Sequence, residues 1–175
     1  MKSVEKSILC FKYYFMGKDK ARQQLEIQLI NLIEKAQAHL TLERAVTGVK
    51  SENVGKKVDG LPYTLWQLVS HLRRTQADIL EFSSNTNYKA LQWPEDYWPK
   101  DAAPGSITEW SQCIKAIKED QEAFIQLLKE TEDLFAPFPH GDGQNMVREA
   151  MLIADHNAYH VGQIIVIRRL LGGFS

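Results

Sequence analysis

Residues 145–173 read NMVREAMLIADHNAYHVGQIIVIRRLLGG, and apolar side chains recur on two sides of the helix that this stretch predicts. One of the two apolar stripes is interrupted by His156 and His160. Asn145 is a favourable N-cap, and the two glycines at the end of the stretch are a favourable stop. A helix that is apolar on two sides packs between neighbours. The pattern therefore predicts a central helix of roughly 40 Å.

The rest of the chain repeats the helical period. Residues 19–37 carry Leu and Ile at three- and four-residue spacing, and a shorter piece with the same period follows at 42–49. Two more long helices open at Thr64 and Ser106, because each of these residues is followed three positions later by Gln or Glu, as in a capping box. The chain is therefore expected to hold four long helices.

Long connections join these helices. Residues 50–60 are polar and contain two glycines, and residues 85–105 contain three prolines with Trp93, Tyr97 and Trp98. A loop as long as 85–105 is usually functional or packed as a lid. Its aromatic residues are therefore expected either to cover a site or to plug one end of the fold. With no strand-like alternation, the sequence predicts an all-α, antiparallel four-helix bundle with long connecting loops.

The composition is that of a soluble globular domain. The 175 residues are 44% hydrophobic and 25% charged, with a net charge of -1. Lys and Arg are not clustered, which argues against a nucleic-acid partner, and no apolar run is long enough for a membrane span. Cys10 and Cys113 suggest neither a disulfide framework nor a metal-binding spacing. A reducing, cytoplasmic location is therefore expected.

Residues 1–15 are expected to be an N-terminal extension that the fold does not need. They include the aromatic-rich segment SILCFKYYF but lack the long apolar core and small-residue cleavage site of a signal peptide. The stretch that begins at Met16 reads like a natural protein start. Residues 16–175 are accordingly predicted to form one domain.

His156 and His160 are the residues most suited to chemistry. Because they are four apart, they stand on one helix face, where two imidazoles can approach one ion at about 2.0–2.1 Å. His71, at the edge of an apolar helical seam, is the best third ligand. Three imidazoles leave coordination positions for water or substrate, as in reactive zinc-type sites.

The spacing of two histidines is weak evidence when taken alone. Histidines that are hydrogen-bonded within the core are the competing interpretation. Residues 157–159 read NAY, so the glutamate of an HExxH motif is absent and a thermolysin-like peptidase is disfavoured.

Four segments carry a resemblance to a known family. DHNAYHVGQ at 155–163 resembles the terminal-helix signature of the DinB/YfiT-like family, and LWQLVSHL at 65–72 is similar to its earlier histidine motif. WPEDYWP at 93–99 and PHG at 139–141 extend the resemblance over most of the chain after Met16. It implies a bacterial four-helix bundle with a three-histidine divalent metal site, often a homodimer.

The resemblance also implies a function. Relatives in the wider superfamily include thiol-dependent S-transferases that use mycothiol or bacillithiol, and a mycothiol-dependent isomerase. The first hypothesis is therefore a metal-dependent thiol S-transferase that joins a low-molecular-weight thiol to a small electrophile. A metal-dependent hydrolase and a non-catalytic metal-binding or stress-response protein are the alternatives. One divalent ion is expected, zinc or nickel before iron, manganese or copper.

Smaller roles are assigned to the neighbours of the histidines. Gln163, close to one turn after the second histidine of the pair, is expected to orient a ligand or a bound water, or else to make a packing contact. Asp155 or Tyr159 is expected to supply a supporting hydrogen bond, with surface contacts as the alternative. His39 and His140 are predicted not to be ligands.

Overall fold

The structure, a computed structural model, describes residues 20–174. Within that range it contains helices and loops and no strand, so the prediction of an all-helical chain is confirmed there. Residues 1–15 lie outside the described residues, and their dispensability stays a prediction. Residues 20–34 are helical, and the further helices are α2 (Leu42–Val46), α3 (Ser51–Val54), α4 (Leu65–Ser84), α5 (Ile107–Glu130) and α6 (Met146–Leu170).

The helix starts follow the capping signals in the sequence. At Thr64 the side chain accepts from the backbone N–H of Gln67, whose own side chain accepts from the backbone of Thr64 in return. Ser106 caps α5, and Asn145 caps α6 through a 3.0 Å hydrogen bond from the Arg148 N–H. Each cap satisfies an N–H group that has no partner within its helix.

Two boundaries differ from the sequence-based prediction. The short helical piece expected at 42–49 ends at Val46, and helix 20–34 ends before the expected residue 37. The four-residue helix α3 lies inside the segment expected to be a connection. Four residues span barely more than one turn, so α3 leaves no periodic trace in the sequence.

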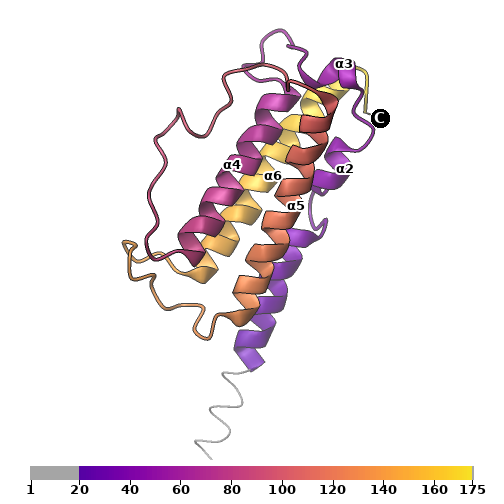
Figure 1. The fold of residues 1–175 in the computed structure, drawn as a ribbon. Helices are drawn as coiled ribbons and strands as arrows, with labels where there is room; N and C mark the ends of the chain where they lie inside the picture. Colours follow the sequence, from indigo (N-terminus) through magenta and orange to yellow (C-terminus); the bar gives the residue numbers. More distant parts are fainter. Residues whose placement is uncertain (1–19, 175) are drawn as a thin grey trace, which may run out of the picture.

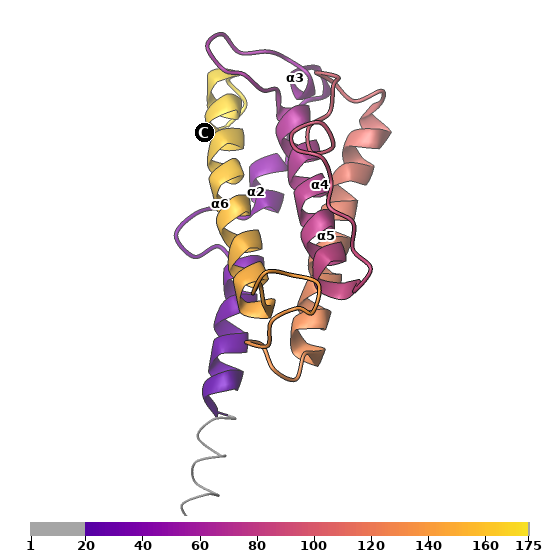
Figure 2. The same cartoon turned by 90° about the vertical axis from the view of Figure 1, so that its left-hand side faces the viewer.

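The long helices α4, α5 and α6 lie side by side (Figures 1 and 2). Two hydrogen bonds join these helices: Cys113 of α5 donates to the carbonyl of Val69, and Gln76 of α4 donates to the carbonyl of Ile117. The residue numbers on the two helices rise together, so α4 and α5 run in the same direction. This is possible because residues 85–106 cross back along the length of α4 before α5 begins (Figure 1).

Helix 20–34 runs opposite to α5. The Arg22 guanidinium donates to the carbonyl of Thr131 at the end of α5, whereas Gln121, farther back along α5, donates to the carbonyl of Ile33. Farther along the chain, α2 packs against α6, where Arg168 near the end of α6 donates to the carbonyl of Ala45. Helix 20–34 and α2 thus cover different parts of the three long helices (Figure 1).

The core consists of two apolar clusters. The first, towards the ends of α4 and α6 that carry Leu65 and Ile167, contains Trp66 and Trp110, and the second is built around Phe124. The buried members of the first cluster are Ala45, Val46, Val54, Leu65, Trp66, Leu68, Val69, Leu72, Trp110, Cys113, Ile117, Val161, Ile164 and Ile167. Those of the second are Leu29, Ile79, Phe124, Leu128, Leu134, Met146, Ala150 and Ile153.

A buried polar layer separates the clusters. Gln76 is only 1% exposed, donates to the carbonyl of Ile117 and accepts a 3.1 Å hydrogen bond from the Asn157 amide. Buried polar groups are costly unless they are paired. Apolar packing is therefore interrupted at this layer. His71 and His156 lie beside it: His71 precedes Gln76 by five residues on α4, and His156 is next to Asn157 on α6.

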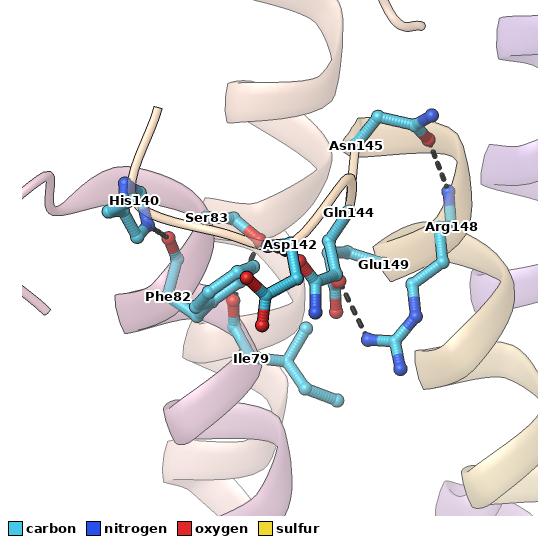
Figure 3. Close-up of polar contacts among 9 residues, drawn as sticks. All are labelled: Ile79, Phe82, Ser83, His140, Asp142, Gln144, Asn145, Arg148 and Glu149. Carbon is cyan, nitrogen blue, oxygen red and sulfur yellow. Dashed lines mark hydrogen bonds and ion pairs between the residues drawn. The ribbon is translucent and has the colours of Figure 1, made fainter. Parts of the chain in front are cut away.

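The loop before α6 is fixed by its own polar contacts (Figure 3). His140 donates from Nε2 to the carbonyl of Phe82 over 2.8 Å, and its ring packs among Phe82 and Phe138. Arg148 pairs with Glu149, which is 1% exposed, over 2.7 Å. The His140 contact joins the loop to the end of α4, whereas the Arg148–Glu149 pair lies within the first turn of α6.

None of the helices in the described part of the chain combines the length and the hydropathy that a membrane span needs.

Candidate metal centre

Three histidines lie together in the structure. His71 comes from α4, and His156 and His160 come from successive turns of α6. Each offers one ring nitrogen, and these nitrogens all lie within 4.8 Å of one another. The Nε2 atoms of His71 and His156 are 3.1 Å apart. Two imidazole nitrogens on one tetrahedral zinc ion lie about 3.3 Å apart, which follows from metal–nitrogen distances of about 2.0–2.1 Å. The donor set therefore fits a divalent cation.

Hydrogen bonds on the far side of two rings orient their free nitrogens. The Nδ1–H of His71 donates to the carbonyl of Tyr97 over 3.1 Å, and the Nδ1–H of His160 donates to Oε1 of Gln163 over 2.7 Å. With the proton on Nδ1, each ring keeps its lone pair on Nε2. Partners of this kind fix the tautomer and raise the basicity of metal-binding histidines. Gln163 thus contacts one of the candidate ligands.

Burial keeps all three imidazoles neutral. It lowers the pKa of His71 to about 4, an effect opposed by the Tyr97 hydrogen bond and assisted by the nearby His160. It lowers the pKa of His156 to about 3, and the other two histidines add to this shift. The pKa of His160 is lowered as well, by burial and against the Gln163 hydrogen bond. Neutral imidazole is the form that binds a metal, so protons do not compete for these nitrogens near pH 7.

An aromatic stack fixes the ring of His71. The Trp98 indole lies on it with ring centroids 3.8 Å apart and planes 5° from parallel. Tyr63 stacks on Trp98 at 4.1 Å and 12°. Trp98 comes from the proline-containing loop, which therefore contributes directly to the candidate site.

That loop is attached to α4 by Asp78. Its carboxylate accepts hydrogen bonds of 2.8 Å from the phenol of Tyr88 and 2.7 Å from the phenol of Tyr97. Burial, followed by the contact with Asp78, raises the pKa of Tyr88 to about 12, and the same two causes raise the pKa of Tyr97. The phenols therefore stay protonated as donors. By holding the Tyr97 side chain, Asp78 also holds the backbone carbonyl that orients His71.

A cavity of about 350 Å³ opens beside the three histidines. It is lined by Tyr63, His71, Thr75, Trp93, Tyr97, Trp98, His156, Tyr159, His160 and Gln163. From the sequence, the aromatic residues of the long loop are expected either to cover a site or to plug one end of the fold. In the structure Trp93, Tyr97 and Trp98 line this cavity. Its volume admits a small molecule.

One buried hydroxyl in the cavity wall has no hydrogen-bond partner among the described residues. Thr75 Oγ1 lies one turn after His71 and is shielded from solvent. A buried polar group without a partner costs about 1–3 kcal/mol, which is a common sign that a ligand or water completes the site. The sequence reasoning did not assign Thr75, although its position four residues after His71 places it on the same helix face.

Of the other residues considered in the sequence, some line the cavity and others lie away from it. Tyr159 lines the cavity and is 64% exposed, with its ring 4.9 Å from that of His160. Asp155 is exposed and does not line the cavity, so the supporting hydrogen bond expected from it is not seen. His39 and His140 lie outside the three-histidine cluster. Tyr63, the outer ring of the stack, is a further contributor that the sequence reasoning did not name.

Comparison of the chain with protein-family models, curated proteins and solved structures gave no significant match.

Proposed function

We propose that this chain is a DinB-like protein that holds one divalent metal ion on His71, His156 and His160. The observation that carries the proposal is the convergence of three neutral imidazoles on one point beside a cavity. The family assignment is supported by the resemblance of the two histidine motifs, together with the all-helical fold. Zinc or nickel is the expected metal. Three imidazoles with open positions also accommodate iron, manganese or copper.

We further propose that the helices form a four-helix bundle. Three positions are taken by α4, α5 and α6, and the fourth is shared by helix 20–34 and α2. In this arrangement α4 and α5 run in one direction, which the long connection between them allows, and helix 20–34 and α6 run in the opposite direction (Figure 1). A homodimer, the other property that the resemblance implies, stays a prediction.

The proposed activity is transfer of a low-molecular-weight thiol to a small electrophile. A divalent ion would supply positive charge that lowers the pKa of a thiol bound to it. In the transfer the thiol loses its proton to solvent water, sulfur forms a bond to carbon, and the leaving group departs with its electron pair. Within residues 20–174, no carboxylate, Lys or Arg lines the cavity. This uncharged lining is compatible with thiol transfer, in which the ion itself would activate the nucleophile; hydrolysis is the alternative activity.

The protein's own groups have defined parts in this proposal. The imidazoles bind the ion, and Trp98 and the Tyr97 carbonyl keep His71 in place. The Thr75 hydroxyl is available to donate a hydrogen bond to the bound substrate, since nothing else accepts from it among the described residues.

Monochlorobimane tests the activity, because its conjugation to a thiol releases chloride and yields a fluorescent product. With metal-loaded protein and bacillithiol, mycothiol or cysteine as the thiol, we expect conjugation well above the rate without protein. Chelation and His71→Ala should each lower that rate by at least about a hundredfold, or about 2.7 kcal/mol of barrier. His39→Ala, an exposed histidine outside the cluster, is the matched control. A rate that survives metal removal would exclude a metal-dependent transferase.

Thr75→Val separates a functional hydroxyl from a structural one. Because the Thr75 hydroxyl has no partner in the described chain, its removal should leave the free energy of unfolding unchanged or raise it. Turnover should fall about tenfold, the effect of losing one hydrogen bond of about 1.4 kcal/mol. Thr131→Val is the contrast, since the Thr131 hydroxyl donates to the carbonyl of Leu127 over 2.8 Å. Thermal melts and conjugation rates measure both. Lost stability with unchanged turnover in Thr75→Val would contradict the assignment.

A further inference from the structure

A second hollow continues the cavity of the candidate metal centre. This groove has a volume of about 270 Å³ and shares Tyr63, Tyr159 and Gln163 with the cavity. It is lined by Leu61, Pro62, Tyr63, Leu68, Tyr159, Gly162, Gln163, Val166 and Ile167. We call it the apolar groove. A molecule whose reacting group lies at the histidines therefore has an adjoining space for the rest of its structure.

Neither the cavity nor the apolar groove is lined by a charged side chain of the described chain. The arginines nearest along α4, Arg73 and Arg74, line a separate hollow that has only Trp98 in common with the cavity. A carboxylate or phosphate brought into the apolar groove would lose its hydration without gaining a cationic partner, which is costly. An uncharged aromatic or aliphatic group would instead gain roughly 25 cal/mol for each Å² of apolar surface that it buries.

Gly162 leaves part of the wall of the apolar groove free of side-chain atoms. It lies in the interior of α6, where glycine destabilises a helix by about 1 kcal/mol relative to alanine. A Cβ atom added there would meet nothing within 4 Å, so close packing does not require glycine at this position. Its neighbours on the same helix face, Tyr159 and Val166, are 64% and 47% exposed. The missing side chain keeps the groove open between them.

We propose that the apolar groove binds the uncharged, apolar part of the substrate, with the reacting group of that substrate at the three histidines. The groove selects neutral aromatic or alkyl compounds over anionic ones. The position of the reacting group rests on the proposed function, whereas the affinity of the groove for apolar molecules does not. The two can therefore be tested separately.

A matched pair of fluorescent probes tests the selectivity on the full chain, with and without metal. N-phenyl-1-naphthylamine is uncharged, and 1-anilinonaphthalene-8-sulfonate has the same aromatic body with one sulfonate added. We expect the uncharged probe to bind at least about tenfold more tightly, because no cationic side chain of the described residues lines the groove. Equal or tighter binding of the sulfonate would overturn the proposal.

Two variants at one position locate the probe. Gly162→Leu fills the groove, and we expect the dissociation constant of the uncharged probe to rise at least about tenfold. Gly162→Ala adds a single methyl group, should change that constant by less than about threefold and should raise the melting temperature. Both replacements favour the helix, so loss of binding in the leucine variant is not a folding defect. Unchanged binding in Gly162→Leu would place the probe elsewhere and overturn the proposal.

Linear thiols connect the groove to the histidines. In competition with the probe on metal-loaded protein, ethanethiol, butanethiol and hexanethiol should bind about fourfold more tightly for each added methylene, as expected for 0.8 kcal/mol per buried CH₂. An affinity independent of chain length would overturn the proposal. So would sedimentation showing a dimer that Gly162→Leu dissociates, because a second copy would then cover the groove. Inactivity towards bimane with these binding results intact would contradict only the proposed transferase.

Discussion

His156→Ala should lower the affinity for zinc by at least about a hundredfold. Structural zinc sites bind with about 10–16 kcal/mol in total, or about 3 kcal/mol for each of four ligands, and 1.4 kcal/mol is a tenfold change in dissociation constant. His156 contributes a neutral nitrogen 3.1 Å from that of His71. The remaining two imidazoles cannot replace it. Titration against a competing chelator measures the change.

The same variant should stay folded. His156 is partly buried, and in the metal-free protein its Nε2–H donates one hydrogen bond of 3.1 Å to the Nε2 of His71, whose own proton is on Nδ1. Removing the His156 ring costs that one hydrogen bond, while the two apolar clusters above and below are unchanged. His140→Ala is the control for loss of a partly buried imidazole, since His140 holds the loop to Phe82. A zinc affinity within threefold of wild type in His156→Ala would exclude this ligand.

Metal removal should leave a cooperative fold that melts at a lower temperature. A ligand present at about a thousand times its dissociation constant stabilises the native state by about 4.1 kcal/mol. In a domain of this size that raises the melting temperature by about 8–16 °C. Metal raises the melting temperature, and does not lower it, because the unfolded chain does not hold His71 near His156 and His160 and so binds the ion less tightly. Paired melts with zinc and with chelator measure it.

His160→Ala tests the same effect by removing a ligand in place of the metal. This variant should remain folded without metal and lose the zinc-dependent rise in melting temperature. Two buried apolar clusters account for the remaining stability, in contrast to a small zinc finger that unfolds without its ion. Collapse of the wild-type fold on chelation would instead make the site structural and remove the basis for an enzyme.

Much of the fold can be read from local sequence. Leu, Ile and Val at helical spacing predict the long helices, and the caps at Thr64 and Asn145 predict where two of them begin. These signals are local, since each depends on residues within one or two turns. The direction in which α4 and α5 run relative to each other is not local. It depends on the path of residues 85–106, which have no periodicity.

The candidate site divides in the same way. His156 and His160 share a face whatever the fold, so their pairing is visible in the sequence, and His71 stood out as a histidine beside an apolar seam. The surroundings of these ligands are formed by the long loop. Neither the stacking of Trp98 on His71 nor the Tyr97 carbonyl behind it can be derived from spacing.

The buried hydrogen bond between Gln76 and Asn157, beside the site, also cannot be predicted from the sequence. Gln76 and Asn157 read as ordinary polar positions on helices whose solvent faces are polar. In the structure they pair across α4 and α6 at the level of the histidines. Only packing decides which polar residues face inward, so this layer appears once the helices are assembled.

X-ray absorption of the zinc-loaded protein, purified without a nickel column, tests the metal centre most directly. A metal analysis first counts the ions in each chain. The three-histidine centre predicts one zinc ion with three imidazole nitrogens at about 2.0–2.1 Å and a further light-atom ligand that exogenous thiol replaces with sulfur at about 2.3 Å. No bound zinc, or a zinc ion closed by a fourth protein ligand that thiol does not displace, would contradict a reactive centre at His71, His156 and His160.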